Sequence, residues 1–290
     1  MSIAVKGTRS NWKADHLETM AREFEMGRVL SQSKLYKEER AEAVTEAFSN
    51  PAFLDMTFLP ATVSVGSEGA PLPIAVIEEL IRRSPHRIIS KTCTCRDAHN
   101  CTEHDKNIGC IHIGANTAEE SDELCYHATV EEAIAHLHKA VDDGLMPFIG
   151  HVFYDHIYWD VDFTSPFLTV CLCCECCCTN FNNYRQGMIR GEATERFKPL
   201  KGLKVSVDAA KCVGCGTCAE KCFNHSMTMV DGAPQWNAET CKGCSSCAIH
   251  CPQKAITIEI EDVKAAVDDL LERLSPQVGG LDLENMQMDL

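Results

Sequence analysis

Eight cysteines toward the C-terminal end form two copies of one pattern whose spacing is typical of iron–sulfur chemistry. Each copy reads Cys-x2-Cys-x2-Cys-x3-Cys, and the second copy is followed by Pro252. A tight Cys-x2-Cys-x2-Cys loop lets three thiolates wrap one face of an iron–sulfur cube, while the fourth cysteine is carried toward another cube. The fourth cysteines of two copies therefore exchange. We expect one [4Fe–4S] cluster on Cys212, Cys215, Cys218 and Cys251, and another on Cys241, Cys244, Cys247 and Cys222.

The stretch from about residue 203 to 260 resembles the bacterial two-cluster ferredoxin. Its cysteines fall in the right order, and Gly214, Gly216 and Gly243 stand where a backbone must curl close to a cluster. Phe223 departs from the pattern, since the first motif usually has proline there, but proline is not a ligand. Two zinc sites or a disulfide framework are the alternatives. Zinc sites usually gather cysteines in separated pairs, and nothing in the sequence suggests secretion.

A second group of cysteines precedes this stretch, and six of them fall within the eight residues 171–178. Such a run would be an oxidation hazard if its thiols were left free. We predict one or two further iron–sulfur clusters in this middle region, with a zinc or structural site as the alternative. One candidate set lies between residues 93 and 110 and the other is the run itself, and mixed sets are equally allowed. The candidate ligands are Cys93, Cys95, Cys101, Cys110, Cys171, Cys173, Cys174, Cys176, Cys177 and Cys178.

The Cys-x-Cys-Arg sequence, together with Cys-x-Cys-Cys-x-Cys-Cys, resembles an iron–sulfur module of anaerobes that is fused ahead of a two-cluster ferredoxin domain. The resemblance covers about residues 75–260 and implies an architecture but little function. Arg96 either donates hydrogen bonds to cluster sulfur or forms a surface salt bridge. Several histidines either ligate iron, as two do in Rieske centres, or lie beside the ligands without binding. They are His104, His112, His127, His151 and His156.

Composition limits the classes of function. The chain has 290 residues, 19 cysteines and a formal net charge of −15, which argues against a nucleic-acid surface. Residues 1–22 contain no apolar signal-peptide core, and no uncharged apolar run reaches the ~20 residues of a membrane helix. We therefore expect a cytoplasmic protein without a membrane span. Its acidity either favours a partner with a basic docking patch or merely keeps the protein soluble.

The elements that must position these cysteines follow from periodicity and turn signals. Apolar residues at helical spacing predict helices within 11–49 and after Pro73, and a capping box at Thr129 and Glu132 predicts a helix to about residue 143. Strands are predicted at 86–92 and within 147–170. The ferredoxin-like part should have strands at 204–207, 227–230, 233–236 and 255–260, with an Asp231-Gly232 turn, then an amphipathic helix over 263–274 and a disordered tail.

These predictions combine into an α+β protein with an N-terminal mixed domain that holds its own cysteine-rich metal site. The expected divisions are the mixed domain at 1–178, a polar basic linker at 179–202, the two-cluster ferredoxin domain at 203–260, and a final helix and tail at 261–290.

The predicted function is transfer of single electrons to or from a partner oxidoreductase of anaerobic metabolism, as a subunit of a complex. The alternative is an enzyme subunit whose middle cysteines hold a catalytic or unusual cluster. The excess of middle cysteines over the four that one cubane needs, with Cys125 in addition, favours that alternative. A redox sensor is a third class. Neither a dinucleotide-binding loop nor a P-loop is present.

Overall fold

The computed structural model describes residues 54–60, 63–64, 73–120, 122–152 and 167–275, together with a few single positions. The single positions are Ala41, Glu42, Thr45, Glu46, Ser49, Asp155 and Trp159. Most of the helices predicted over 11–49 lie outside the described residues, as do His156 and the tail from residue 276. The fold is α+β, as predicted. Within the described part of the chain, no helix is both long enough and apolar enough to cross a membrane.

A seven-stranded sheet forms the centre of the larger part, with the strand order β5-β3-β4-β7-β6-β1-β8. Its neighbours are antiparallel except for β1 and β8, which pair in parallel. The strands predicted at 86–92 and within 147–170 are confirmed as β3, β6 and β7. The strands are β1 (Leu54–Phe58), β3 (Arg87–Ser90), β4 (Ile111–Ile113), β5 (Cys125–His127), β6 (Met146–Val152), β7 (Leu168–Cys173) and β8 (Phe197–Lys198).

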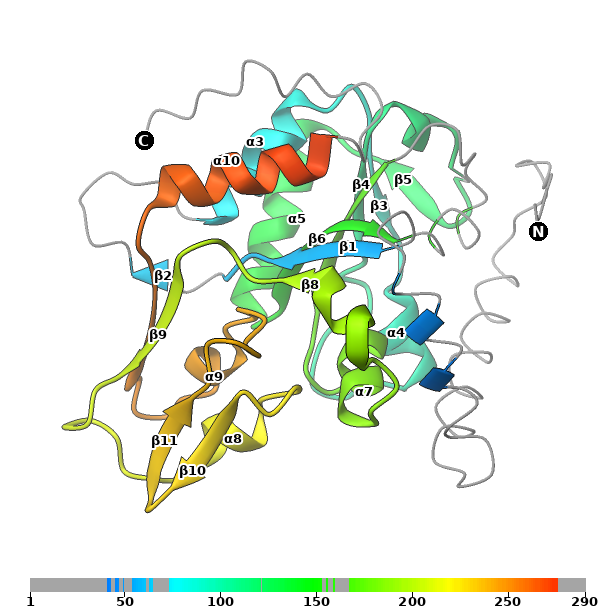
Figure 1. The fold of residues 1–290 in the computed structure, drawn as a ribbon. Coiled ribbons are helices and arrows are strands. Elements are labelled where there is room, and N and C mark those ends of the chain that lie inside the picture. The colour runs from blue at the N-terminus through cyan, green and yellow to red at the C-terminus, as the bar shows by residue number, and fades with distance from the viewer. Residues whose placement is uncertain are drawn as a thin grey trace.

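Three helices pack in one apolar core with the sheet: α3 (Pro73–Arg83), α5 (Val130–Asp142) and α10 (Val263–Leu274). Figure 1 shows α10, in orange-red, in the same layer as α3. The predicted capping box is confirmed, since the Thr129 side chain accepts from the Glu132 amide and the Glu132 carboxylate accepts from the Thr129 amide. Strand alternation directs Ile149 of β6 into this core and its neighbour Phe148 into a second one.

The second core is aromatic and contains Phe58, Phe148, Phe181 and Phe197. Residues 179–202, which the sequence analysis assigned to a linker, contribute to it. They form α7 (Thr179–Arg185), the 3₁₀ helix η3 (Gly191–Arg196) and β8, which extends the sheet beside β1. The basic residues of this segment suggested a polar linker that either lies against the acidic cluster domains or is solvated. Its apolar positions are buried, however, and they fix it to the sheet.

The smaller, ferredoxin-like part contains two short helices, α8 (Thr217–Glu220) and α9 (Ser246–Ile249), and two small sheets. The predicted Asp-Gly hairpin is confirmed, because Asp231 and Gly232 have φ angles of 49° and 78° between paired strands. The other sheet has the order β2-β12-β9. Its strands and those of the hairpin are β2 (Val63–Ser64), β9 (Leu203–Val207), β10 (Met227–Val230), β11 (Ala233–Trp236) and β12 (Ile256–Ile260).

The two parts exchange elements. The N-terminal strand β2 pairs in parallel with β12 of the ferredoxin-like part. In the opposite direction, α10 follows the ferredoxin-like part but packs in the core of the large sheet. Its Arg273 Nη1 donates to Thr57 Oγ1 at 2.8 Å and lies 3.3 Å from Asp55 Oδ1 on β1. Strand β2 and helix α10 therefore connect the two parts of the structure to each other.

Candidate metal centres

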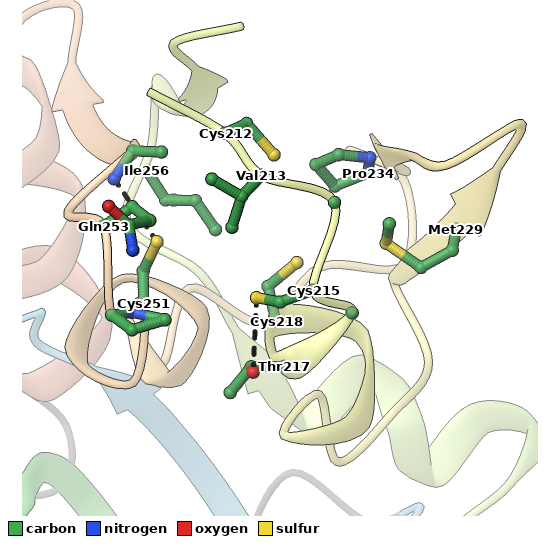
Figure 2. A pocket seen from close by; sticks show the side chains of 14 residues that line it. Cys212, Val213, Cys215, Thr217, Cys218, Met229, Pro234, Cys251, Gln253 and Ile256 are labelled. Atoms are coloured by element: carbon green, nitrogen blue, oxygen red, sulfur yellow. Dashed lines mark hydrogen bonds between the residues drawn. The ribbon is translucent and has the colours of Figure 1, made fainter. Parts of the chain in front are cut away.

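Two cavities in the ferredoxin-like part are each lined by one of the predicted sets of four cysteines. The first has a volume of about 350 Å³, including space open to solvent, and Figure 2 shows its cysteines around the loop that carries Val213. The second, of about 380 Å³, is built in the same way. The first set is Cys212, Cys215, Cys218 and Cys251, and the second is Cys222, Cys241, Cys244 and Cys247.

Glycines let the cysteine loops curl tightly. Gly214 has φ +67°, and a Cβ there would lie 2.7 Å from the Gly232 carbonyl oxygen. A Cβ at Gly243, where φ is +72°, would lie 2.8 Å from Leu203 Cδ1. At Gly214 only glycine meets both demands, a left-handed backbone and a close backbone neighbour. At Gly243 the left-handed backbone is the main constraint, because the tip of the Leu203 side chain can move aside. The loops are therefore built to hold their thiols around a space.

The two cavities differ in exposure. Burial raises the pKa of Cys244 and raises that of Cys247 to about 12, so these thiols stay neutral until a metal displaces their protons. Cys215 is exposed, and a hydrogen bond with Thr217 lowers its pKa. The neighbouring Val213 is 65% exposed. The first cavity therefore presents one cysteine to solvent, whereas Cys244 of the second packs against the aromatic core.

The order of the cysteines, their grouping around two cavities and the glycine turns are those of a domain that carries two clusters. Residues 204–252 match the family model of the 4Fe-4S dicluster domain. The match covers this part alone, and no curated protein and no solved structure matches the chain. The dicluster domain and the cysteine-rich region before it make this an iron–sulfur protein.

Strand β7 divides the middle cysteines. Leu168, Val170 and Leu172 point into the core that contains α3, α5 and α10, so the alternate residues Cys171 and Cys173 point to the aromatic side. The strand ends at Cys173, and the turn that follows places Cys174 and Cys177 in the helix-covered core. The run therefore contributes to two separate sites on opposite sides of the sheet.

On the aromatic side, six cysteines form what we call the six-cysteine group. Cys110 Sγ lies 3.8 Å from Cys171 Sγ, and Cys178 Sγ lies 3.4 Å from Cys173 Sγ. Cys95 Sγ lies 3.1 Å from Thr179 Oγ1, and a hydrogen bond with Cys93 lowers the pKa of Cys95 to about 6. The group consists of Cys93, Cys95, Cys110, Cys171, Cys173 and Cys178, drawn from both predicted sets.

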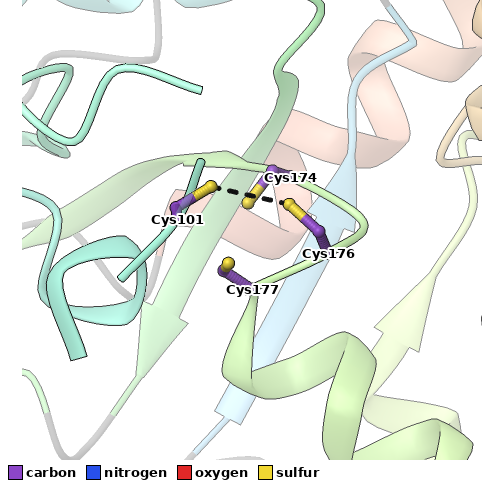
Figure 3. A group of neighbouring side chains, drawn as sticks. All are labelled: Cys101, Cys174, Cys176 and Cys177. Carbon is purple, nitrogen blue, oxygen red and sulfur yellow. Dashed lines mark hydrogen bonds between the residues drawn. The ribbon is translucent and has the colours of Figure 1, made fainter. Parts of the chain in front are cut away.

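On the helix-covered side, four cysteines form what we call the four-cysteine group: Cys101, Cys174, Cys176 and Cys177. Their Sγ atoms all lie within 4.8 Å of one another, and Figure 3 shows them converging. Cys101 Sγ and Cys176 Sγ are 3.6 Å apart. A hydrogen bond with Cys176 lowers the pKa of Cys174 to about 5. Cys101 is thus separated from Cys93, Cys95 and Cys110, with which the first predicted set had grouped it.

Arg96 lies between the two groups and is 1% exposed, so of the two alternatives for this residue the surface salt bridge is wrong. Its guanidinium donates to the carbonyls of Asp105, Ile108 and Leu172. Burial lowers the pKa of Arg96. The negative charges of Cys93, Cys174 and Cys110 raise it by more than that, so the net pKa lies above its usual value. Arg96 joins the loop before β4 to β7 and supplies positive charge to both groups.

The candidate histidines that the structure describes lie outside the two thiol groups, except that His104 approaches Cys176 of the four-cysteine group. His112 is fully buried on β4, where its Nδ1 lies 3.0 Å from both carboxylate oxygens of Glu120, and its Nε2 has no hydrogen-bond partner among the described residues. His104 Nδ1 lies 3.0 Å from Asp143 Oδ2, and His127 is exposed near Asp122. His151 is half-buried on β6. His104 also lies near Glu175 and Cys176.

Two contacts that tie the cysteine run and the following helix α7 to the dicluster domain escaped the sequence analysis. Glu175 Oε1 lies 2.7 Å from Lys221 Nζ and 3.5 Å from His250 Nε2. Phe223 is 1% exposed and stacks on Phe181 of α7. The signal that could have found the second contact was Phe223 itself, an aromatic residue where the motif usually has proline.

Proposed function

We propose that this chain is an electron-transfer protein that relays single electrons through two [4Fe–4S] clusters in the dicluster domain and one further cluster at the six-cysteine group. The dicluster ligands are the two sets of four cysteines that line the two cavities. The clusters supply reversible one-electron chemistry, and the protein sets potential and path by burial, hydrogen bonds and charge.

One observation carries this proposal: a single aromatic core contains cysteines from both regions. Cys173 and Cys178 of the six-cysteine group pack in the same core as Phe181 and Phe223, and Cys244 of the second cavity packs against it. Phe223 directly follows Cys222, another cysteine of that cavity. The buried packing excludes water between the two sites and fixes their separation.

The surroundings of the six-cysteine group suit an anionic centre. Arg96 places a permanent positive charge beside Cys93 and Cys110, and Thr179 offers a hydroxyl to Cys95. Positive charge and hydrogen bonds near cluster sulfur raise a cluster's potential. These residues would therefore hold this cluster at a higher potential than the same ligands would in an apolar site.

The first cavity, with its exposed cysteine, is the proposed contact with a partner. Cys215 and Val213 lie at the surface there, and the net charge of −15 favours an oxidoreductase with a basic docking patch. Electrons would pass between this partner and the first cavity, then the second cavity, then the six-cysteine group. We place the partner in anaerobic metabolism and this chain within its complex.

The test is a reductive titration of the full-length protein under anaerobic conditions, followed by EPR. The proposal expects more electron equivalents per chain than two clusters accept. In a Cys95→Ser/Cys110→Ser/Cys171→Ser variant, which leaves only three cysteines in the six-cysteine group, the excess should disappear while the dicluster signals remain. An unaltered titration in this variant would contradict a redox centre at the six-cysteine group.

A second candidate, substrate reduction at the six-cysteine group, is favoured by its number of thiols. One cubane needs four ligands, and the group offers six beside the buried pair of His112 and Glu120. The two candidates differ in one observable. A catalytic cluster would change its EPR signal when cyanide or carbon monoxide is added, whereas a relay cluster with four thiolate ligands would not.

A further inference from the structure

We propose that the four-cysteine group binds one zinc ion in a tetrahedral tetrathiolate site, separate in metal and in role from the iron–sulfur centres. Cys174, Cys176 and Cys177 come from the turn after β7, and Cys101 comes from the loop after the short helix α4 (Thr94–Ala98). The inference goes beyond the proposed electron relay, because zinc does not change oxidation state in proteins.

The spacing of the sulfurs carries the inference. A zinc–thiolate bond of about 2.3 Å in a tetrahedron places the sulfurs about 3.8 Å apart. Cys101 Sγ and Cys176 Sγ are 3.6 Å apart, and all four sulfurs lie within 4.8 Å of one another. In a cubane each thiolate binds a different iron, so four ligand sulfurs cannot all lie this close together. Pairs of sulfurs in the six-cysteine group are as close, but no three of them lie within 4.8 Å of one another, so one sulfur from each pair can still bind a cluster. The four-cysteine group already has the dimensions of a single-ion site.

The dicluster cysteines provide an internal comparison. They line cavities of about 350 and 380 Å³, and no three of their sulfurs lie within 4.8 Å of one another. Within the part of the chain that the structure describes, four thiol sulfurs come this close together only at the four-cysteine group. The same fold thus spreads the cysteines of its cluster-binding domain and gathers these four.

The location suits a structural ion. Cys174 and Cys177 are buried in the core with α3, α5 and α10, on the side of the sheet away from the aromatic core. A metal here would crosslink residues 75 positions apart in the chain, Cys101 and Cys176. It would hold the end of β7 in place, and the register of β7 sets the positions of Cys171 and Cys173.

The first experiment measures metals in the full-length protein purified anaerobically from iron-rich medium with trace zinc. We expect one zinc ion per chain that survives mild chelation, with four sulfur neighbours at about 2.3 Å in zinc-edge X-ray absorption. An absence of retained zinc, a shell of nitrogen or oxygen neighbours, or iron bound at these cysteines would overturn the proposal. The measurement requires no substitution, so a folding defect cannot obscure it.

The second experiment compares Cys176→Ser with Cys173→Ser, which lie three residues apart in the same run. Cys176→Ser should lose the zinc and keep the wild-type iron content and EPR signals. Cys173→Ser should keep the zinc, and any iron that it loses should come from the six-cysteine group. Loss of iron with retention of zinc in Cys176→Ser would refute the zinc site. Failure of the relay alone would leave the zinc in place and appear as a wild-type iron content equal to that of two clusters.

Discussion

The ring of Phe223 stacks on the ring of Phe181 with centroids 4.4 Å apart and an interplanar angle of 13°. Phe58 and Tyr184 surround the pair, with centroids 5.7 and 5.0 Å from that of Phe223. The residue that departs from the ferredoxin pattern is thus the one that anchors the dicluster domain to the segment after the cysteine run. Its position beside Cys222 makes the anchor part of the proposed electron path.

Phe223→Ala should remove this anchor. Truncation of a fully buried phenylalanine costs about 3–5 kcal/mol, so we expect a lower melting temperature and slower electron exchange between the dicluster domain and the six-cysteine group. Circular dichroism and rapid-freeze EPR measure these effects. Val230→Ala, at a 52% exposed position of the hairpin, is the control and should change stability by no more than about 0.5 kcal/mol. Equal melting temperatures for the two variants would refute the anchoring role.

Gly214→Ala and Gly187→Ala form a matched pair, because the two glycines have φ angles of +67° and +69°. A Cβ at Gly187 meets nothing within 4 Å, whereas one at Gly214 meets the Gly232 carbonyl oxygen. Gly187→Ala should cost only the left-handed backbone strain, about 1–2 kcal/mol. Gly214→Ala should cost more and should also lower iron content, measured per chain after anaerobic purification. Full iron content in Gly214→Ala would contradict the close packing of the first cavity's loop.

His136 on α5 should give stability a dependence on pH. Burial lowers its pKa, and its Nε2 lies 2.9 Å from the Gly109 carbonyl oxygen. Because the unfolded state takes up a proton near pH 6.5 and the folded state resists it, stability is lost as pH falls below about 6.5. His136→Gln keeps a donor for Gly109 and should flatten this slope in melts between pH 7.5 and 5.5.

The control for this prediction is His138→Gln on the same helix. The His138 side chain is 53% exposed and pairs with Glu78 at the surface. Exposed pairs contribute at most about 1 kcal/mol, so this variant should keep the wild-type slope. If His138→Gln flattened the slope and His136→Gln did not, the assignment to the buried histidine would be wrong.

Arg96→Gln should destabilise the middle region strongly. Removing one partner of a buried charged network costs about 3–5 kcal/mol, and glutamine cannot reach three carbonyls. Arg96→Lys keeps the charge without the planar guanidinium, so its stability should fall between that of Arg96→Gln and that of wild type. Thermal melts of the metal-loaded proteins measure this order of stability. Arg82→Gln, on the surface of α3, should leave the melting temperature nearly unchanged.

The dicluster part was predictable almost residue by residue because its motif encodes the loops directly. Three cysteines at intervals of three must face one cavity, and Asp231-Gly232 allows only a tight hairpin turn. The sequence also identified the helices that begin at Pro73 and after Thr129, since proline and a capping box are local signals.

The grouping of the middle cysteines was not predictable because it depends on where β7 ends. Cys173 and Cys174 are neighbours in the chain but enter different cores, and only the strand's register and the following turn decide this. Residues 179–202 were assigned to a linker for a related reason. Their basic side chains were visible in the sequence, whereas the burial of Phe181 and Phe197 depends on tertiary packing.

The most direct test of the central claim is the iron, acid-labile sulfide and zinc content of the anaerobically purified full-length protein. It is compared with that of Cys95→Ser/Cys110→Ser/Cys171→Ser, which leaves only three cysteines in the six-cysteine group, and of Cys125→Ser, whose cysteine lies outside both groups. We predict that wild type holds more iron and sulfide than two [4Fe–4S] clusters supply. The triple variant should lose that excess, and Cys125→Ser should keep it. Wild-type iron equal to two clusters and unchanged in the triple variant would contradict a third cluster.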